Sequence, residues 1–175
     1  MLYLIVGPSC AGKNTLVNEV LRKRNDIVKA ISTTTRPRRE GEFNGRDYFF
    51  TTEADFMRKV KSNEMLEWFS VHGELYGTEI SSLKGKNVIK IIDVQGASTL
   101  RKKGIKCIPI FIKASMNTIQ KRLEKRKDPN MTIRLKNAVK ELQEAKKYNY
   151  IIDNNGELQE AVNNLLKVID KYIEK

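Results

Sequence analysis

The chain has 175 residues, 40% of them hydrophobic and 31% charged, which is typical of a globular protein of one domain. Its 33 lysines and arginines against 21 acidic residues give a formal net charge of +12. This excess favours polyanionic partners such as nucleotides, nucleic acids or anionic membrane surfaces. Two cysteines are too few for a disulfide framework and lack metal-ligand spacing. The sequence shows no membrane-length apolar run and no export signal, so the expected compartment is the cytoplasm.

Short apolar runs alternate along the chain with segments of helical periodicity, which indicates an α/β fold with a parallel central sheet between helices. The runs that predict the strands of this sheet are Leu2–Val6, 27–31, 88–92, 108–112 and 150–152. The segments that predict its helices begin at about Lys13 and then cover about 95–103, 115–125, 131–147 and 157–173. Because Pro109 has no backbone donor, the strand that contains it is expected to begin late or to lie at a sheet edge.

The stretch from about 32 to 85 interrupts this alternation and is predicted to be an inserted substrate region. It opens with a basic loop that lacks apolar periodicity, and loops of this length are usually functional or disordered. The elements predicted after the loop are strands at 48–50, Met65–Val71 and 76–80 and a capped helix from Thr52 to Val60. We expect a single domain, in which 1–31 and 86–175 form the core. Trp68 is interpreted as a buried aromatic residue of the hydrophobic core, and His72, which has no catalytic partner, is interpreted as structural.

A phosphate-binding loop is predicted between the first strand and the first helix. Residues 7–13 fit the pattern GxxxxGK, whose backbone N–H groups and helix dipole attract phosphate oxygens. Lys13 is expected to reach the outer phosphates. The residues predicted to bind the nucleotide are Gly7, Pro8, Ser9, Cys10, Ala11, Gly12, Lys13, Asn14 and Thr15. Asn14 stands where Ser or Thr normally offers a hydroxyl to Mg²⁺, and its amide oxygen can serve as a hard-cation ligand.

A series of short motifs follows the phosphate loop in a fixed order. The motifs are STTTR at 32–36, REGE at 39–42, NGRDY at 44–48, EW at 67–68, YGT at 76–78 and DVQG at 93–96. Together they resemble the guanylate kinase family over nearly the whole chain, and the ordered series is far more specific than the phosphate loop alone. The resemblance implies a P-loop three-layer fold with a GMP-binding region of mixed strands and a helical lid at about 122–136. It also implies an enzyme that uses ATP and Mg²⁺ to convert GMP, and possibly dGMP in addition, to the diphosphate.

The same resemblance divides the acceptor site between phosphate and base. It assigns four residues to the acceptor phosphate: Arg36, Arg39, Tyr48 and Tyr76. Guanidinium groups bind phosphate oxygens in pairs, and tyrosine hydroxyls add oriented donors. It assigns four others to guanine: Ser32, Glu67, Thr78 and Asp93. Carboxylates suit the guanine edge that carries N1–H and N2–H₂, a hydroxyl can donate to O6, and the wrong base would leave buried carboxylates unpaired.

Three arginines match the family positions in and beside the lid: Arg122, Arg126 and Arg134. Phosphoryl transfer depends mainly on positioning and charge neutralisation, so these arginines and Lys13 are the predicted catalytic residues. Arg122 and Arg126 are four apart and share a helix face. The segment between Arg126 and Arg134 is shorter than is usual in the family.

A second departure from the family concerns Ile91, which replaces the first acid of an Asp-x-Asp arrangement that ends at Asp93. Strand alternation places both positions on one face, so an anion is missing there. Asn14 and Ile91 are therefore expected to alter one and the same metal environment. The substrate-binding residues are intact, and catalytic rate is the property that these changes would affect.

Three other functions are alternatives to a guanylate kinase. One is a related kinase for another small phosphorylated acceptor, which Glu67 together with Asp93 argues against. Another is a guanylate kinase-like binding module with weakened catalysis, which the two departures suggest but Gly12, Lys13 and the lid arginines oppose. The net charge also suggests nucleic-acid binding, although no aromatic and basic recognition motif accompanies it. The sequence does not indicate an oligomeric state.

Overall fold

A parallel five-stranded sheet forms the centre of the protein. The structure is a computed structural model and describes residues 1–71 and 73–173, so His72 lies outside the described residues. The strands of the sheet are β1 (Leu2–Val6), β2 (Ile27–Ala30), β7 (Asn87–Ile91), β8 (Ile108–Lys113) and β9 (Tyr150–Asp153). They lie in the order β2-β7-β1-β8-β9, and all neighbours are parallel. The predicted α/β class with a parallel central sheet is confirmed.

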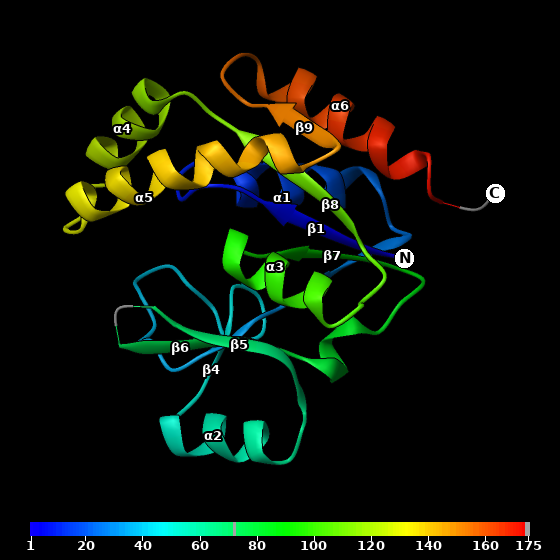
Figure 1. The fold of residues 1–175 in the computed structure, drawn as a ribbon, viewed down its shortest axis with the longest axis vertical. Helices are drawn as coiled ribbons and strands as arrows, with labels where there is room; N and C mark the ends of the chain where they lie inside the picture. Colours follow the sequence, from blue (N-terminus) through cyan, green and yellow to red (C-terminus); the bar gives the residue numbers. More distant parts are fainter. Residues whose placement is uncertain (72, 174–175) are drawn as a thin grey trace.

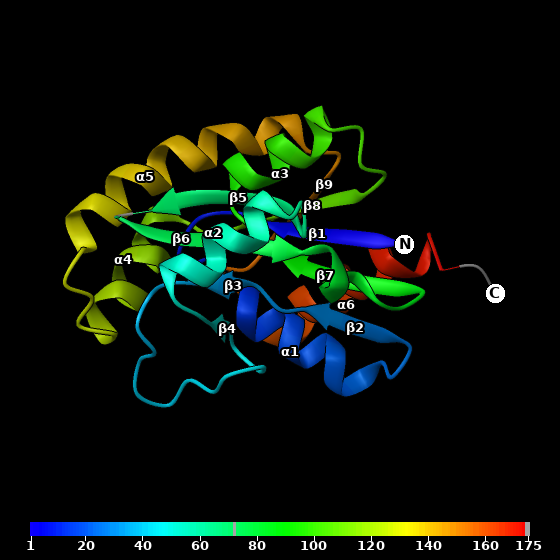
Figure 2. The ribbon, with the colours of Figure 1, turned by 90° about the horizontal axis from the view of Figure 1, so that it is seen from below.

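Helices cover both faces of this sheet. They are α1 (Lys13–Lys23), α3 (Val94–Lys102), α4 (Met116–Lys125), α5 (Met131–Gln143), which continues into the 3₁₀ helix η2 (Glu144–Lys147), and α6 (Leu158–Asp170). One core lies under α1 and α6, where Leu16, Val17 and Val20 are fully buried, and a second lies under α3 and η2 (Figures 1 and 2). The two cores give the predicted three layers. Within the described residues, no helix combines the length and the apolar character needed to cross a membrane.

A second, smaller sheet is built from the chain between β2 and β7. Its elements are β3 (Thr33–Thr34), β4 (Phe49–Phe50), α2 (Glu53–Lys61), β5 (Met65–Val71), β6 (Glu74–Glu79) and the 3₁₀ helix η1 (Ile80–Leu83). The strand order is β4-β3-β6-β5, with β3 and β4 parallel and the other pairs antiparallel. Thr52 accepts a hydrogen bond from the backbone N–H of Asp55, so the predicted cap of α2 is confirmed. In Figure 1 this region lies below the central sheet.

Two local predictions are wrong. β8 begins at Ile108 and lies inside the sheet, between β1 and β9. Pro109 is tolerated there because pairing with β9 begins only at Ile110, so a missing donor on that side breaks no ladder. Trp68 is 43% exposed, because side chains alternate along β5 and it is the neighbouring Glu67, only 2% exposed, that points inward.

Candidate active site

The loop between β1 and α1 has the conformation that a phosphate-binding loop requires. Gly12 is the N-terminal cap of α1 and has a φ of 94°, in the left-handed region that favours glycine. Cys10 also has a positive φ, 61°, and is the loop's one non-glycine residue of this kind within the described chain. Asn154, which follows β9, donates from Nδ2 to the carbonyl of Ala11 at 2.7 Å. The buried amide of Asn154, which is not part of the loop, therefore stabilises the loop conformation.

Lys13 folds back over this loop. Its Nζ donates to the carbonyl oxygens of Gly7 and Pro8, at 2.5 and 2.8 Å. Burial lowers the pKa of the ammonium group to about 8, against the opposing effect of the Glu141 and Asp93 carboxylates. An outer phosphate would replace the two loop carbonyls with a charged acceptor, which makes a stronger hydrogen bond.

Two arginines at the end of α4, Arg122 within the helix and Arg126 as its C-terminal cap, reach the phosphate loop. Arg122 donates from Nη1 to the carbonyl of Cys10 and from Nη2 to the carbonyl of Asn154, both at 3.1 Å. Arg126, one turn later on the same helix face, lies with Nη1 at 3.5 Å from Sγ of Cys10. The structure therefore places both side chains at the loop, as their four-residue spacing suggests.

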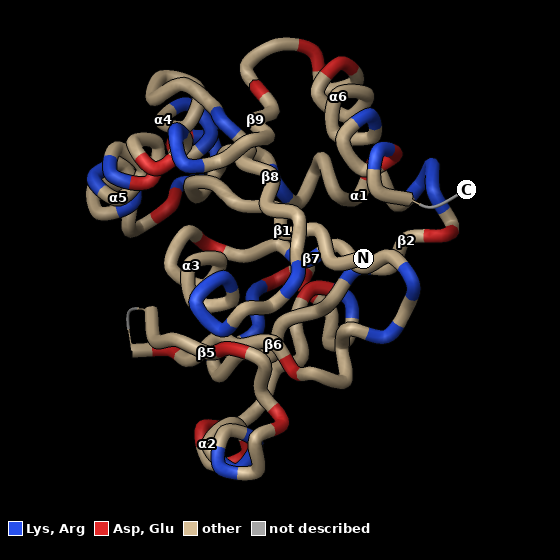
Figure 3. The backbone as a smooth tube through the Cα atoms, turned by 45° about the vertical axis from the view of Figure 1, so that its right-hand side comes forward, with Lys and Arg blue, Asp and Glu red and all other residues tan. Residues whose placement is uncertain are grey.

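The third arginine arrives from α5. Arg134 donates from Nη1 to Oγ of Ser9 at 2.6 Å, and its Nε pairs with the carboxylate of Asp128 at 3.1 Å. α4 and α5 carry several basic residues with acidic ones between them (Figure 3). All three lid arginines therefore lie against the phosphate loop, where negative charge would accumulate during transfer.

A cavity of about 220 Å³ lies beside the phosphate loop, between the two sheets. Its lining includes Ser9, Lys13, Ser32, Tyr48, Glu67, Tyr76, Lys90, Asp93 and Glu141. Residues predicted to bind ATP and residues predicted to bind GMP thus border one space. This shared space is what a direct transfer between two bound nucleotides requires.

The carboxylate of Glu67 has one oxygen that accepts no hydrogen bond from the described residues. Thr78 donates from Oγ1 to its Oε1, whereas its Oε2 is buried and has no hydrogen-bond partner among the described residues. Burial raises the pKa of this carboxyl, and the hydrogen bond from Thr78 opposes the rise. A buried oxygen without a donor is costly, so Oε2 marks where a ligand N–H would bind.

Asp93 lies at the start of α3 and borders the cavity beside the phosphate loop. Its Oδ1 accepts from the backbone N–H of Gly96 at 2.6 Å and thereby caps α3. Burial raises the pKa of the carboxyl, while the hydrogen bond from Gly96 and the charge of Lys13 lower it. The hydrogen bond from the backbone N–H of Gln95 also lowers this pKa.

The residues predicted to hold the acceptor phosphate are only partly assembled. Arg36 pairs with both oxygens of Glu42, at 2.7 and 2.9 Å, and its guanidinium lies 5.5 Å from the centre of the Tyr48 ring. The Tyr48 and Tyr76 rings meet edge to face, 6.1 Å apart. Arg39 is exposed, and its side chain makes no hydrogen bond to any residue that the structure describes. The structure therefore brings three of the four residues together and leaves Arg39 at the rim.

Asn14 and Ile91 border one small cavity of about 80 Å³, together with Glu42 and Asp47. The Asn14 amide is exposed and makes no hydrogen bond within the described chain, so its oxygen is available to a cation. Across residues 1–71 and 73–173, no cluster of three or more His, Cys, Asp or Glu side chains could hold a metal. The polar residues that border this small cavity fit a Mg²⁺ ion that takes most of its ligands from nucleotide phosphates and water, with at most a few from the protein.

Sequence reasoning missed three residues at this site: Lys90, Glu141 and Asn154. Lys90 is the one charged residue in the apolar strand β7 and is 2% exposed, a signal that the sequence already contained. Glu141 borders the main cavity from α5, and burial raises the pKa of its carboxyl. No sequence pattern singles out Glu141 or Asn154, because both depend on how the last helices return to the sheet.

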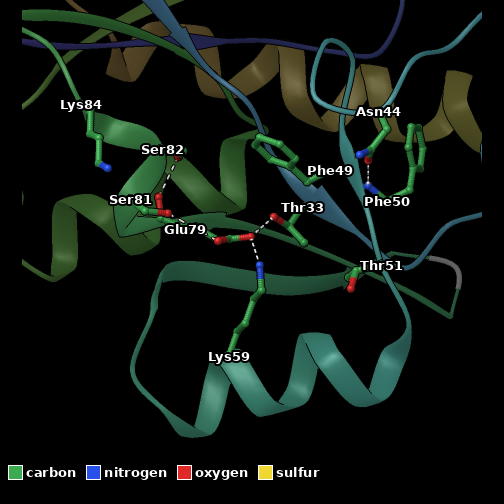
Figure 4. A pocket seen from close by; sticks show the side chains of 10 residues that line it. All are labelled: Thr33, Asn44, Phe49, Phe50, Thr51, Lys59, Glu79, Ser81, Ser82 and Lys84. Atoms are coloured by element: carbon green, nitrogen blue, oxygen red, sulfur yellow. Dashed lines mark hydrogen bonds and ion pairs between the residues drawn. The ribbon is translucent and has the colours of Figure 1, made fainter.

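A second cavity, of about 460 Å³, lies on the small sheet away from the phosphate loop (Figure 4). Its polar side chains pair with one another, since Glu79 accepts hydrogen bonds from both Thr33 and Lys59. This pairing leaves no buried group waiting for a ligand among the described residues that line it. We therefore do not assign the active site to this cavity, although it is the larger of the two.

Comparison with known proteins finds relatives along nearly the whole chain. A family model described as guanylate kinase matches residues 1–172. The guanylate kinase of Thermotoga maritima is 39% identical over 177 residues, which cover 96% of this chain and 85% of the relative. That of Fusobacterium nucleatum is 40% identical over 181 residues, covering 98% and 97%. The crystal structure of guanylate kinase from Anaplasma phagocytophilum matches with a TM-score of 0.80 at 29% identity, over 99% of this chain and 87% of that one. The chain belongs to the guanylate kinase family.

Proposed function

We propose that the protein transfers the terminal phosphoryl group of ATP to GMP and so forms ADP and GDP. The observation that carries this proposal is the single cavity that joins Lys13 of the phosphate loop to the unpaired, buried oxygen of Glu67. Lys13 faces where a donor phosphate would lie, and Glu67 offers an acceptor to a base that carries N–H groups on its edge. Family membership and the names of the relatives support the same reaction.

On the ATP side, residues 7–15 bind the phosphates through backbone N–H groups and the start of α1. Lys13, Arg122, Arg126 and Arg134 neutralise charge on the outer phosphates as the phosphoryl group moves, since all four already lie at the loop. Residues 122–136 act as the lid. Its closure would exclude water from the transfer and bring the guanidinium groups to the developing charge.

On the GMP side, the region of about 32–85 binds the acceptor. Arg36, Tyr48 and Tyr76 hold its phosphate, and Arg39 moves in from the rim when that phosphate arrives. Glu67 accepts from the guanine edge, Thr78 fixes the carboxylate of Glu67, and Ser32 and Asp93 complete the base contacts. This arrangement points the GMP phosphate toward Lys13, so that its oxygen attacks the terminal phosphorus of ATP in line.

Mg²⁺ is the proposed cofactor, with Asn14 as the protein residue that contacts it directly or through water. The ion, when bound, supplies charge neutralisation at the outer phosphates of ATP. Because both substrates are nucleotides of the cell interior, we propose that the enzyme acts in the cytoplasm.

A coupled ADP-release assay tests the proposal with GMP, dGMP, AMP, CMP and UMP as acceptors. We expect turnover with GMP and, at a lower or similar rate, with dGMP. Equal turnover of AMP and GMP would overturn the assignment. GMP binding without any ADP release would favour the alternative of a binding module, although such a module has no need of a lysine and three arginines at the phosphate loop.

A further inference from the structure

Lys90 is a charged residue in a place where a folded protein rarely accepts one. It lies within β7 between Ile89 and Ile91 and is 2% exposed. Burial lowers the pKa of its ammonium group to about 8, with the Glu67 carboxylate opposing that effect. An isolated buried charge is strongly destabilising, so a residue of this kind usually has a partner or a function.

The described residues do not supply a full partner for this ammonium group. Nζ of Lys90 donates to Oγ of Ser32, a neutral acceptor. Lys90 forms no ion pair with any carboxylate in residues 1–71 and 73–173, Glu67 included. An ammonium group has three N–H donors. Two of these N–H donors therefore remain available to a ligand or a water molecule in the cavity.

Lys90, Ser32 and Glu67 border the same cavity. The cavity thus has an acceptor side, formed by Oε2 of Glu67, and a donor side, formed by Lys90 and Ser32. Because Oγ of Ser32 accepts from Lys90, its own hydrogen must point away from the lysine, and it can point into the cavity. Two donors therefore stand next to one acceptor.

We propose that Lys90 is a specificity-determining residue that donates, beside Ser32, to the carbonyl oxygen at position 6 of the acceptor purine. The proposal rests on the proposed function, since it deepens the recognition of GMP. The guanine edge presents O6, N1–H and N2–H₂ in a row, which matches two donors followed by a carboxylate. Adenine places an amino group at position 6, whose hydrogens would face the ammonium group and be rejected.

The test compares GMP with 6-thio-GMP, which keeps N1–H and N2–H₂ but replaces O6 by sulfur, a weaker acceptor. Equilibrium binding and kcat/KM are measured for the unaltered enzyme and for Lys90→Met, which keeps an unbranched side chain but removes the ammonium group. We expect Lys90→Met to weaken GMP by about 10- to 100-fold, the range of a hydrogen bond to a charged group. It should weaken 6-thio-GMP much less and should narrow the preference for GMP over AMP.

Lys103→Met is the matched control. Lys103 also acts on the Glu67 carboxylate through its charge, but it is exposed, donates to the carbonyl of Leu66 at 2.7 Å and does not border the cavity. This variant should leave the ratio of GMP to 6-thio-GMP unchanged. Lys90→Gln, a neutral donor, should restore part of the preference and serves if Lys90→Met does not fold.

Two outcomes would overturn the inference. One is an equal loss for GMP and 6-thio-GMP in both Lys90 variants, because that loss would mean that Lys90 only supports the fold. The other is a Lys90→Met variant that keeps full activity and shows an unchanged ratio of GMP to 6-thio-GMP. Failure of the unaltered protein to phosphorylate GMP would instead overturn the proposed function, and the binding ratios would still report on Lys90.

Discussion

Nη1 of Arg134 lies 2.6 Å from Oγ of Ser9 and so joins α5 to the phosphate loop across 125 residues of sequence. The same guanidinium is held from behind by Asp128 at 3.1 Å. An arginine that is oriented in this way before substrate arrives needs little rearrangement to meet the charge that appears during transfer. Arg134 forms no hydrogen bond or ion pair with the described residues proposed to bind GMP, so its effects on the two steps can be separated.

Arg134→Ala is therefore expected to lower kcat by roughly 100-fold, the scale of losing one preorganised charged donor. GMP binding at equilibrium should remain nearly unchanged, because Arg134 lies on the ATP side. Initial rates and calorimetric binding measure the two quantities separately. Arg58→Ala removes an exposed arginine of α2 and serves as the control. A loss of GMP affinity at normal kcat would show that Arg134 is wrongly placed.

Glu67→Gln should raise KM for GMP by about 5- to 150-fold, because one hydrogen bond to a buried carboxylate is worth about 1 to 3 kcal/mol. The amide cannot accept from N1–H and N2–H₂ together, so the preference against AMP should also relax. Glu64→Gln, an exposed glutamate just before β5, is the matched control and should change neither value. An unchanged KM in Glu67→Gln would exclude Glu67 from base recognition.

Lys90 also makes a prediction about stability and pH. Burial lowers its pKa from 10.5 to about 8, so between these values the unfolded chain binds a proton that the folded chain does not. The free energy of unfolding therefore rises with pH through this window, and below it the folded protein carries a buried charge. Lys90→Met lacks that charge, so it should be more stable than the unaltered protein near pH 7, by at most roughly 3 kcal/mol.

Urea unfolding at about pH 7 and about pH 10 measures this difference in both proteins. The gain of Lys90→Met should shrink as pH rises from 8 toward 10.5. Lys13, whose pKa is lowered in the same direction, is present in both proteins and cancels. A gain that is constant with pH would mean that packing, and not a buried charge, separates the two proteins.

Much of the fold follows from local patterns. The phosphate loop was predicted because its GxxxxGK pattern lies between an apolar run and a helical period, and β5 was predicted with its bounds at Met65 and Val71. The position of Trp68 was not, because an aromatic beside an acid is normally the buried one of the two. In β5 the alternation of side chains buries Glu67 at the cavity and leaves Trp68 exposed. Local preference is overridden where the site needs a polar group inside.

Contacts between distant segments could not be predicted from the sequence alone. Ser32 and Lys90 meet because β2 and β7 are neighbours in the sheet, with Ala30 opposite Lys90. That strand order is a property of the whole fold. Glu42 illustrates the same limit, since its pairing with Arg36 depends on how the basic loop turns back. The resemblance to a family names residues for a site, but it does not reveal which of them are already paired with one another.

The final prediction concerns Mg²⁺. Asn14 and Ile91 border one cavity, where a hydroxyl and a carboxylate would be usual for the family. A neutral amide and an apolar side chain should hold the octahedral shell of the ion less firmly, although the phosphates of ATP still bind most of it. The unaltered protein is therefore expected to be active, with a raised Mg²⁺ requirement.

Asn14→Ser and Ile91→Asp should each lower the Mg²⁺ concentration that gives half of the maximal rate. If both act on one shell, the double variant should differ from the sum of the single variants by at least about 0.5 kcal/mol. A Mg²⁺ titration of initial rates for the four members of this cycle makes the measurement. Asn18→Ser, an exposed asparagine further along α1, controls for a general effect on the helix. Ile91→Asp also introduces a carboxylate at a half-buried position of β7, so unfolding is measured in parallel. Saturation of the unaltered protein at ordinary Mg²⁺, with no gain in any variant, would show that both substitutions are neutral to the metal.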